Sequence, residues 1–361
     1  MQRSRRVVLR AQLHAASILG ATLDLPGTSL VARRVKPPST QEEVIAGVPV
    51  TTVRPGGRGP WPALVFMNGA TPDGRTHPMV LRLSLALART GRLVFIPDLP
   101  GVAGGELSPV TLATSVGFAQ AAASSADAAD STAALAGVSI GGSLALLCAA
   151  DSRVADHVSG VVCIAPYSDL ERVMLLATTG SYAFADGVRP YPVPPYLAVG
   201  LARSLAAMLS PTPATAALCE ELRGIDPSAV DAVEFREAAF HAAGAEALAV
   251  FELLSNRDPN RFGDLYAALP EHIRSTVADL SPLQHAASLR APVEIATAPR
   301  DRYFPVAESR ALVAASPRVR LTVTSLLAHA TPRLSVRYLA ELGRLNAFFV
   351  RALEATVTRP A

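Results

Sequence analysis

The sequence predicts an α/β protein with a mostly parallel, doubly wound sheet that is interrupted by a helical insertion. From about residue 42, short apolar segments alternate with helix-like segments. Strands that are apolar throughout are typical of a parallel sheet covered by helices on both faces. The alternation stops after about residue 170 and resumes near residue 282. The intervening stretch is rich in proline and alanine and has no clear strand pattern.

The expected elements follow in order along the chain. Residues 42–47 and 48–56 are predicted to form a two-stranded start, with a turn at Ala46 and Gly47. Buried strands are expected at 62–70, 92–101, 132–139 and 158–166, and helices at 77–91, 108–126 and 140–153. The Ala-rich run at 132–139 is also compatible with a helix and is assigned by its context. After the insertion we expect strands at 291–301 and 318–326 and helices at 306–316 and 333–353.

These elements divide the chain into an N-terminal extension at 1–41, a core at 42–170 and 282–361, and a helical insertion at 171–281. The first 25 residues favour an amphipathic helix over a signal peptide, because Arg10, Gln12 and His14 interrupt the apolar stretch. No eighteen uncharged apolar residues run together, so no membrane-spanning helix is expected. The sequence does not indicate an oligomeric state.

Composition excludes several classes of function. Half of the 361 residues are hydrophobic and 17% are charged, which provides ample material for a buried core. The net charge is only +3, and the basic residues are spread out apart from Arg3, Arg5, Arg6 and Arg10 at the start, which argues against a nucleic-acid surface. Cys148, Cys163 and Cys219 lack metal-ligand spacing, as do the histidines, so no metal and no cofactor is expected. An odd number of core-type cysteines fits a reducing, cytoplasmic compartment.

The stretch "GVSIG" places Ser139 between Gly137 and Gly141, where a predicted strand gives way to a predicted helix. A serine in such a sharp turn has a strained backbone, and the residues two positions away must be small. The turn would expose the hydroxyl at the start of a helix, whose dipole favours developing negative charge. The alternative is an ordinary Gly-rich helix start with an inactive serine. The N–H of Ile140, directly after the serine, is a candidate oxyanion donor.

A nucleophilic serine needs a base and an acid that orients it. Asp301 follows a predicted strand in "APRDRYFP", and His329 follows the last predicted strand in "LLAHATPR". Both are expected at the same edge of the sheet as Ser139, in the chain order Ser, Asp, His. Asp169, which also follows a strand, is the competing acid. Among the other histidines, His77 is the one expected to border the site.

In these motifs the chain resembles the α/β-hydrolase superfamily, over about residues 42–170 and 282–355. The resemblance implies a second oxyanion donor in the loop after the first core strand. Members usually begin this loop with His-Gly; here the matching residues are Asn68 and Gly69, and Ala70 would supply the N–H. Asn68 departs from the usual histidine but can still hold the loop by hydrogen bonds.

The resemblance implies a serine hydrolase in which the insertion forms a cap over Ser139. An apolar cap favours the carboxylic ester of a hydrophobic small molecule. Aromatic residues of the insertion are possible pocket walls: Tyr182, Phe184, Tyr191 and Tyr196. An acyltransferase with the same triad, a thioesterase, a lactonase and an amidase remain open. The alternative of a different class is a non-catalytic protein that binds a ligand in the same fold.

Overall fold

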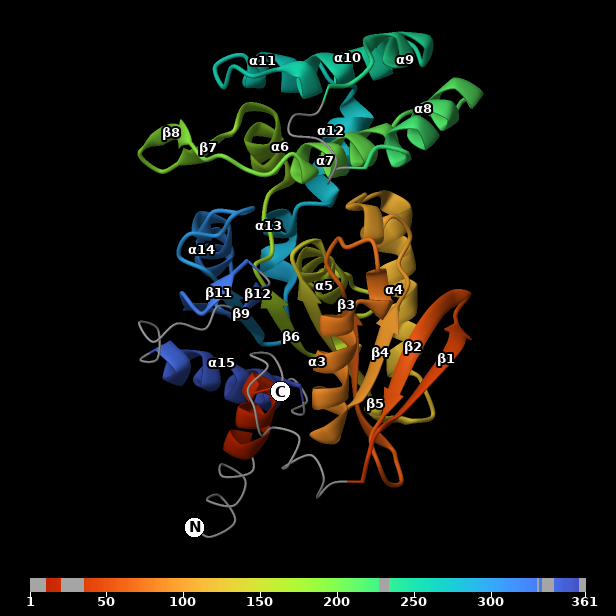
Figure 1. Ribbon diagram of the computed structural model, residues 1–361, viewed down its shortest axis with the longest axis vertical. Coiled ribbons are helices and arrows are strands. Elements are labelled where there is room, and N and C mark those ends of the chain that lie inside the picture. Colours follow the sequence, from red (N-terminus) through yellow and green to blue (C-terminus); the bar gives the residue numbers. More distant parts are fainter. Residues whose placement is uncertain (1–10, 21–35, 227–233, 330, 333–340, 357–361) are drawn as a thin grey trace.

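The computed structural model describes residues 11–20, 36–226, 234–329, 331–332 and 341–356, and they are arranged around one eight-stranded sheet (Figure 1). The strand order is β1-β2-β4-β3-β5-β6-β9-β10. β1 and β2 pair antiparallel and β2 joins β4 antiparallel; all later pairs are parallel. The expectation of a mostly parallel sheet behind a two-stranded start is therefore confirmed.

The strands match the apolar segments of the sequence closely. Their bounds are β1 (Ser39–Ile45), β2 (Val48–Arg54), β3 (Trp61–Met67), β4 (Leu93–Pro97), β5 (Ala128–Val138), β6 (Val158–Ile164), β9 (Val293–Thr297) and β10 (Val319–Val323). The strands β4 and β9 are buried along their whole length, as expected for a sheet covered on both faces. β1 begins three residues before the expected start of the core.

Helices cover both faces of the sheet and form two separate apolar clusters. On one face lie α3 (Pro78–Arg89), α15 (Leu342–Ala355) and a helix at residues 11–20, which buries Ala15 and Ile18 against Phe348. The other face carries α4 (Pro109–Ala123) and α5 (Ile140–Ala150). α14 (Val306–Ala315) connects the last two strands of the sheet. The first eight residues of the expected last helix, 333–340, lie outside the described residues.

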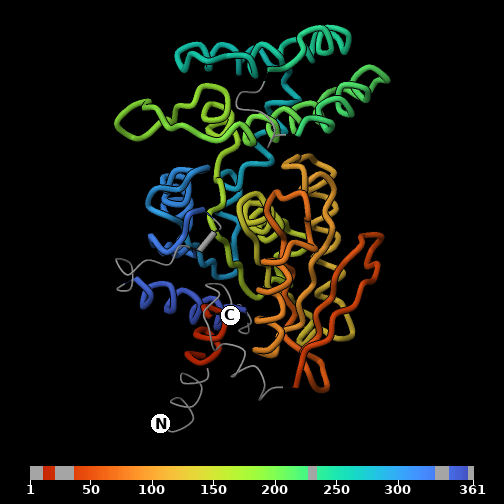
Figure 2. The backbone as a smooth tube through the Cα atoms, viewed as in Figure 1, coloured from red at the N-terminus to blue at the C-terminus, as the bar shows by residue number. Residues whose placement is uncertain are grey.

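The inserted segment leaves the sheet after β6 and lies above the edge at which the parallel strands end (Figures 1 and 2). Its helices are α6 (Leu170–Thr179), α7 (Tyr196–Ala206), α8 (Pro213–Arg223), α9 (Glu237–Ala242), α10 (Ala245–Ser255), α11 (Phe262–Ala267) and α12 (Glu271–Asp279). α13 (Pro282–His285) then returns the chain to the side of α5.

The inserted segment also contains a hairpin, so the expectation that it holds no strand is wrong. β7 (Ser181–Phe184) pairs antiparallel with β8 (Gly187–Pro190). Each strand has only four residues and a Pro-rich run follows, so the sequence is too short here to show a period of two. The turn depends on Gly187, because glycine adopts its φ of 124° at little energetic cost.

A buried arginine joins the inserted segment to the core. Arg203 of α7 is 7% exposed, and its guanidinium donates to four backbone carbonyls: Leu222, Arg223, Ile225 and, on the core side, Gly104. Burial lowers the pKa of this guanidinium. Glu106 and Arg223 add an ion pair across the same seam, 3.1 Å between Nε and Oε2. These contacts fix α7 over the end of the sheet.

Within the described ranges, no helix is long and apolar enough to cross a bilayer. The same ranges contain no group of three or more His, Cys, Asp or Glu side chains placed to hold a metal ion. Cys148, Cys163 and Cys219 are free thiols, and burial raises the pKa of each. The fully buried thiols of Cys148 and Cys163 are therefore less reactive than an exposed cysteine.

Candidate active site

Ser139 lies in the turn between β5 and α5 with a strained backbone, at φ 55° and ψ −126°. A non-glycine residue in this region costs about 1–3 kcal/mol, so the surrounding structure must hold it there. The N–H of Ser139 donates to the carbonyl of Ile164 on β6 at 2.8 Å. Its own carbonyl accepts from Gly142 and Ser143 at the start of α5. The turn is thus fixed on both sides, and the serine side chain projects beyond the end of the sheet.

The two glycines around Ser139 are required because the backbones on either side approach closely. A Cβ on Gly137 would lie 2.6 Å from the N of Gly142. A Cβ on Gly141 would lie 2.5 Å from the carbonyl oxygen of Asn68 and closer still to that of Met67, at the end of β3. Real Cβ atoms essentially never approach this closely. The steric argument made from the sequence therefore holds at both positions.

Asp301 and His329 lie in hydrogen-bond contact although 28 residues separate them. His329 Nδ1 is 2.8 Å from Asp301 Oδ1 and 3.0 Å from Oδ2. Asp301 follows β9, and His329 lies at φ 58° between the short strands β11 (Leu327–Ala328) and β12 (Thr331–Pro332). Because an ionised carboxylate only accepts, this contact assigns a proton to Nδ1 and leaves Nε2 free to act as a base.

The loop after Asp301 holds both members of this pair. The N–H groups of Tyr303 and Phe304 donate to Asp301 Oδ1 at 2.8 and 3.0 Å, and the aspartate side chain is fully buried. The two rings also pack on His329, with centroid distances of 4.5 Å for Tyr303 and 5.8 Å for Phe304. From the inserted segment, the Tyr191 hydroxyl donates to the backbone carbonyl of Asp301. The carboxylate and the imidazole therefore have little freedom to turn.

The loop after β3 lies against the serine turn. A Cβ on Gly69 would be 3.1 Å from the carbonyl oxygen of Val138 and 3.5 Å from Ser139 Cβ. Asn68 is buried, and its amide donates to the carbonyl of Gly69 at 3.0 Å. The next residue, Ala70, lines the same cavity as Ile140. Among the described residues, neither of these two backbone N–H groups has a hydrogen-bond acceptor.

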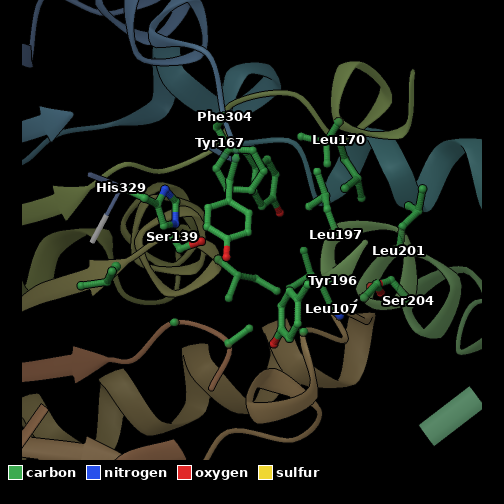
Figure 3. Close-up of a pocket in the computed structure, with 18 residues that line it drawn as sticks. Leu107, Ser139, Tyr167, Leu170, Tyr196, Leu197, Leu201, Ser204, Phe304 and His329 are labelled. Carbon is green, nitrogen blue, oxygen red and sulfur yellow. Dashed lines mark hydrogen bonds between the residues drawn. The ribbon is translucent and has the colours of Figure 1, made fainter. Parts of the chain in front are cut away.

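A cavity of about 210 Å³ lies between the core and the inserted segment, and Ser139 and His329 both open into it (Figure 3). The figure shows the imidazole of His329 beside the hydroxyl of Ser139 at one end. The remaining wall is mainly apolar: Leu107, Tyr167, Leu170, Val173, Leu197, Leu201 and Phe304. The strained serine, the aspartate–histidine pair and two free N–H groups thus surround one apolar space.

Comparisons with protein-family models and with curated proteins find no match to the chain. Solved structures do resemble it. The acylaminoacyl peptidase of Pyrococcus horikoshii aligns with a TM-score of 0.52 and 11% identity, over 92% of this chain and 44% of that one. Est1E from Butyrivibrio proteoclasticus aligns with a TM-score of 0.50 and 13% identity, over 88% of this chain and 99% of that one.

The chain has the α/β-hydrolase fold. It spans less than half the length of the acylaminoacyl peptidase that it matches. At these identities the likeness concerns the fold alone, and function depends on the site that the fold carries.

Asp169, the competing candidate for the acid, has a different role in this α/β-hydrolase fold. Asp169 caps α6, accepting from the N–H groups of Glu171 and Arg172, and its Oδ2 lies 3.5 Å from the Arg172 Nε. His77 is likewise occupied as the N-cap of α3, where its Nδ1 accepts from Met79. His77 is not part of the cavity wall.

Of the four aromatic residues expected as pocket walls, Tyr196 alone lines the cavity. Tyr182 is fully buried and donates to Glu308, while Phe184 packs on it with a centroid distance of 4.8 Å. Tyr167, Tyr303 and Phe304 also line the cavity, although the sequence did not predict it. Phe304 could have been found from its place directly behind the candidate acid, but nothing in the local pattern around Tyr167 signals a pocket.

Proposed function

We propose that this protein is a serine hydrolase that cleaves a carboxylic ester of a hydrophobic small molecule through an acyl-enzyme on Ser139. The observation that carries the proposal is the convergence of a strained serine, a buried Asp301–His329 hydrogen bond and free backbone N–H groups on one apolar cavity. Each of these is common alone, but acyl transfer needs all three around the same point.

In the proposed reaction, Ser139 Oγ attacks the ester carbonyl while His329 Nε2 takes its proton. Asp301 keeps the second imidazole proton on Nδ1 and stabilises the imidazolium that forms. The N–H groups of Ala70 and Ile140 stabilise the oxyanion of the tetrahedral intermediate. His329 then returns its proton to the leaving alcohol. A water molecule, activated by the same histidine, attacks the acyl-enzyme and releases the acid and free Ser139.

The cavity favours a small apolar ester over a peptide. Its volume of about 210 Å³ lies below the usual 300–1,000 Å³ of ligand pockets. The inserted segment acts as a cap, since α7 lines the same cavity as Ser139 and is anchored to the core through Arg203. A short chain or a single ring fits such a space. Exclusion of water by the cap also strengthens the hydrogen bonds to the oxyanion.

Turnover of a chain-length series of p-nitrophenyl esters tests the proposal. We expect hydrolysis with an optimum at about four to six acyl carbons, because longer chains exceed the cavity. Ser139→Ala should abolish turnover. Ser143→Ala is the matched control, since Ser143 is a nearby buried serine whose hydroxyl donates to the Tyr167 carbonyl at 2.9 Å. Equal loss in both variants, or turnover that survives in Ser139→Ala, would contradict the proposed nucleophile.

Hydrolysis and acyl transfer share these residues and differ only in the acceptor that attacks the acyl-enzyme. Product analysis with water competing against an added alcohol or thiol separates them. We expect free acid as the main product at millimolar acceptor. A dominant new ester or thioester would assign the site to an acyltransferase instead.

A further inference from the structure

The hairpin of the inserted segment carries three aromatic side chains on one face. Tyr182 and Phe184 alternate along β7, and Tyr191 follows β8 directly. The N–H of Tyr191 donates to the carbonyl of Gly180 at 2.7 Å, so Tyr191 extends the ladder and shares the face of Tyr182. The ring of Phe184 lies 4.8 Å from that of Tyr182 and 6.5 Å from that of Tyr191, between centroids. None of these three rings lines the cavity, so this face serves another purpose.

The two hydroxyl groups on this face bond to α14 and to the loop that leads into it. Tyr182 donates to the carboxylate of Glu308 on α14. Tyr191 donates to the backbone carbonyl of Asp301, the first residue of the loop at 301–305, here called the acid loop. Burial and the nearby Asp301 carboxylate raise the pKa of Tyr191 to about 12. The phenol therefore keeps its proton at neutral pH and can donate.

Glu308 is a buried carboxylate that the proposed reaction does not use. It is 0% exposed, and besides the Tyr182 hydroxyl it accepts from the N–H and hydroxyl of Ser168, at 2.6 and 2.7 Å, and from the N–H of Asp169 at 3.0 Å. A carboxylate is tolerated in such a place only when donors surround it. Ser168 and Asp169 lie directly before α6, where the chain enters the inserted segment. Glu308 thus joins the start of the inserted segment and the hairpin to α14.

The contact of Tyr191 bears on the orientation of the acid. The Asp301 carboxylate is 2.8 Å from His329 Nδ1, and its direction depends on the backbone torsions of the same residue. Rotation of that backbone would carry the carboxylate away from the imidazole. A hydrogen bond to the Asp301 carbonyl opposes the rotation, and it comes from the inserted segment rather than from the core.

Resting on the function proposed above, we propose that the β7–β8 hairpin positions the acid loop and that Tyr191 is the positioning residue that holds Asp301 against His329. Glu308 anchors the hairpin for this purpose. The inserted segment accordingly does more than line the cavity, because the geometry of the Asp301–His329 pair depends on where the hairpin lies.

Tyr191→Phe tests this inference, since it keeps the ring and removes the hydroxyl. We expect kcat on p-nitrophenyl butyrate to fall about tenfold with KM unchanged, because one hydrogen bond is lost and Tyr191 does not line the cavity. A wild-type kcat overturns the inference. Tyr266→Phe is the matched control. Tyr266 is a half-buried tyrosine of α11, which Figure 1 shows in the layer of the inserted segment farthest from the sheet, and its kcat should not change.

A double-variant cycle separates positioning from a general structural role. A residue that acts through the Asp301 carboxylate has little left to disturb once Asp301→Asn is present. We therefore expect Tyr191→Phe to slow fluorophosphonate labelling about tenfold in wild type and less than twofold in Asp301→Asn. The same fold loss in both backgrounds refutes the positioning role.

Proton NMR of the His329 Nδ1–H gives a readout that does not depend on turnover. A proton held between an imidazole and a carboxylate resonates far downfield. In Tyr191→Phe this signal should move upfield or broaden, whereas in Tyr266→Phe it should match wild type. Ser168→Ala removes one donor to Glu308 and should move the signal in the same direction. An unchanged signal in Ser168→Ala contradicts the anchoring role of Glu308.

The two kinds of measurement distinguish this inference from the proposed function. A signal that changes in Tyr191→Phe supports the inference even if wild type hydrolyses no ester, a result that would refute only the proposed function. Turnover that depends on Ser139, together with an unchanged signal and an unchanged kcat in Tyr191→Phe, refutes the inference and leaves the proposed function standing.

Discussion

Gly141→Ala adds only one methyl group, yet it should strongly disturb the turn that holds Ser139. The added methyl group would lie 2.5 Å from the Asn68 carbonyl oxygen and closer to that of Met67. Both atoms belong to backbone at the end of β3, so no side chain can rotate away. Relief requires α5 to move off the sheet, which also moves Ser139 and Ile140 relative to Ala70. The perturbation therefore acts on stability and on site geometry together.

The expected magnitudes follow from these distances. Forcing one extra methyl group into a closely packed site costs typically 1–3 kcal/mol, and contact with backbone places Gly141→Ala at about 3 kcal/mol. A displacement of about 1 Å in a catalytic arrangement can lower the rate about 10²-fold. Urea unfolding measures the first effect. The rate of fluorophosphonate labelling, measured well below the unfolding transition, gives the second.

Gly117→Ala in α4 provides the matched control. Gly117 is exposed within the helix, and a Cβ there would meet nothing within 4 Å. Replacing an exposed helical glycine by alanine stabilises by about 0.5–1 kcal/mol. The two variants should thus shift the free energy of unfolding in opposite directions. The steric account of the turn is refuted if Gly141→Ala retains wild-type stability and labelling rate.

Three further changes have expected outcomes. Asp301→Asn should lower kcat on p-nitrophenyl esters by about 10⁴-fold with little change in KM, because the amide no longer fixes the His329 tautomer; a decrease below tenfold would contradict the assigned acid. Arg203→Met should destabilise by about 2–3 kcal/mol, since four backbone carbonyls lose their donor, and limited proteolysis should then cleave first in the inserted segment. Burial raises the pKa of Glu294 above its unfolded value despite the Arg351 contact. The native state then binds the extra proton, so the stability of wild type relative to Glu294→Gln should fall as the pH rises from about 4 to 7. The opposite slope would show that the ion pair dominates.

The sheet and the turns at its edge were predictable because they depend on local chemistry. Uniformly apolar segments predict buried strands, and glycines mark where helices and strands end. Even the Ala-rich run at 132–139 was assigned correctly, as part of β5, from its neighbours. The positions of Asp301 and His329 after their strands follow from the same alternation of strands and helices. Their hydrogen bond is a long-range contact, which the sequence pattern anticipates only through the shared edge of the sheet.

The inserted segment was less predictable because its contacts are not periodic. The hairpin β7–β8 has strands too short to show alternation. Tyr182 and Tyr196 look equivalent in the sequence, yet one donates to a buried glutamate and the other faces the cavity. That difference is decided by Glu308, which lies more than a hundred residues away on α14. Which side chain reaches a pocket thus depends on packing partners that composition does not reveal.

The central claim is that Ser139 is an activated nucleophile. Intact-mass measurement after treatment with a fluorophosphonate, followed by peptide mapping, tests this claim most directly. We expect a single adduct per chain, located on Ser139, that is absent from Ser139→Ala and forms much more slowly in Asp301→Asn. An unmodified wild-type chain, or an adduct on another serine, would contradict the account.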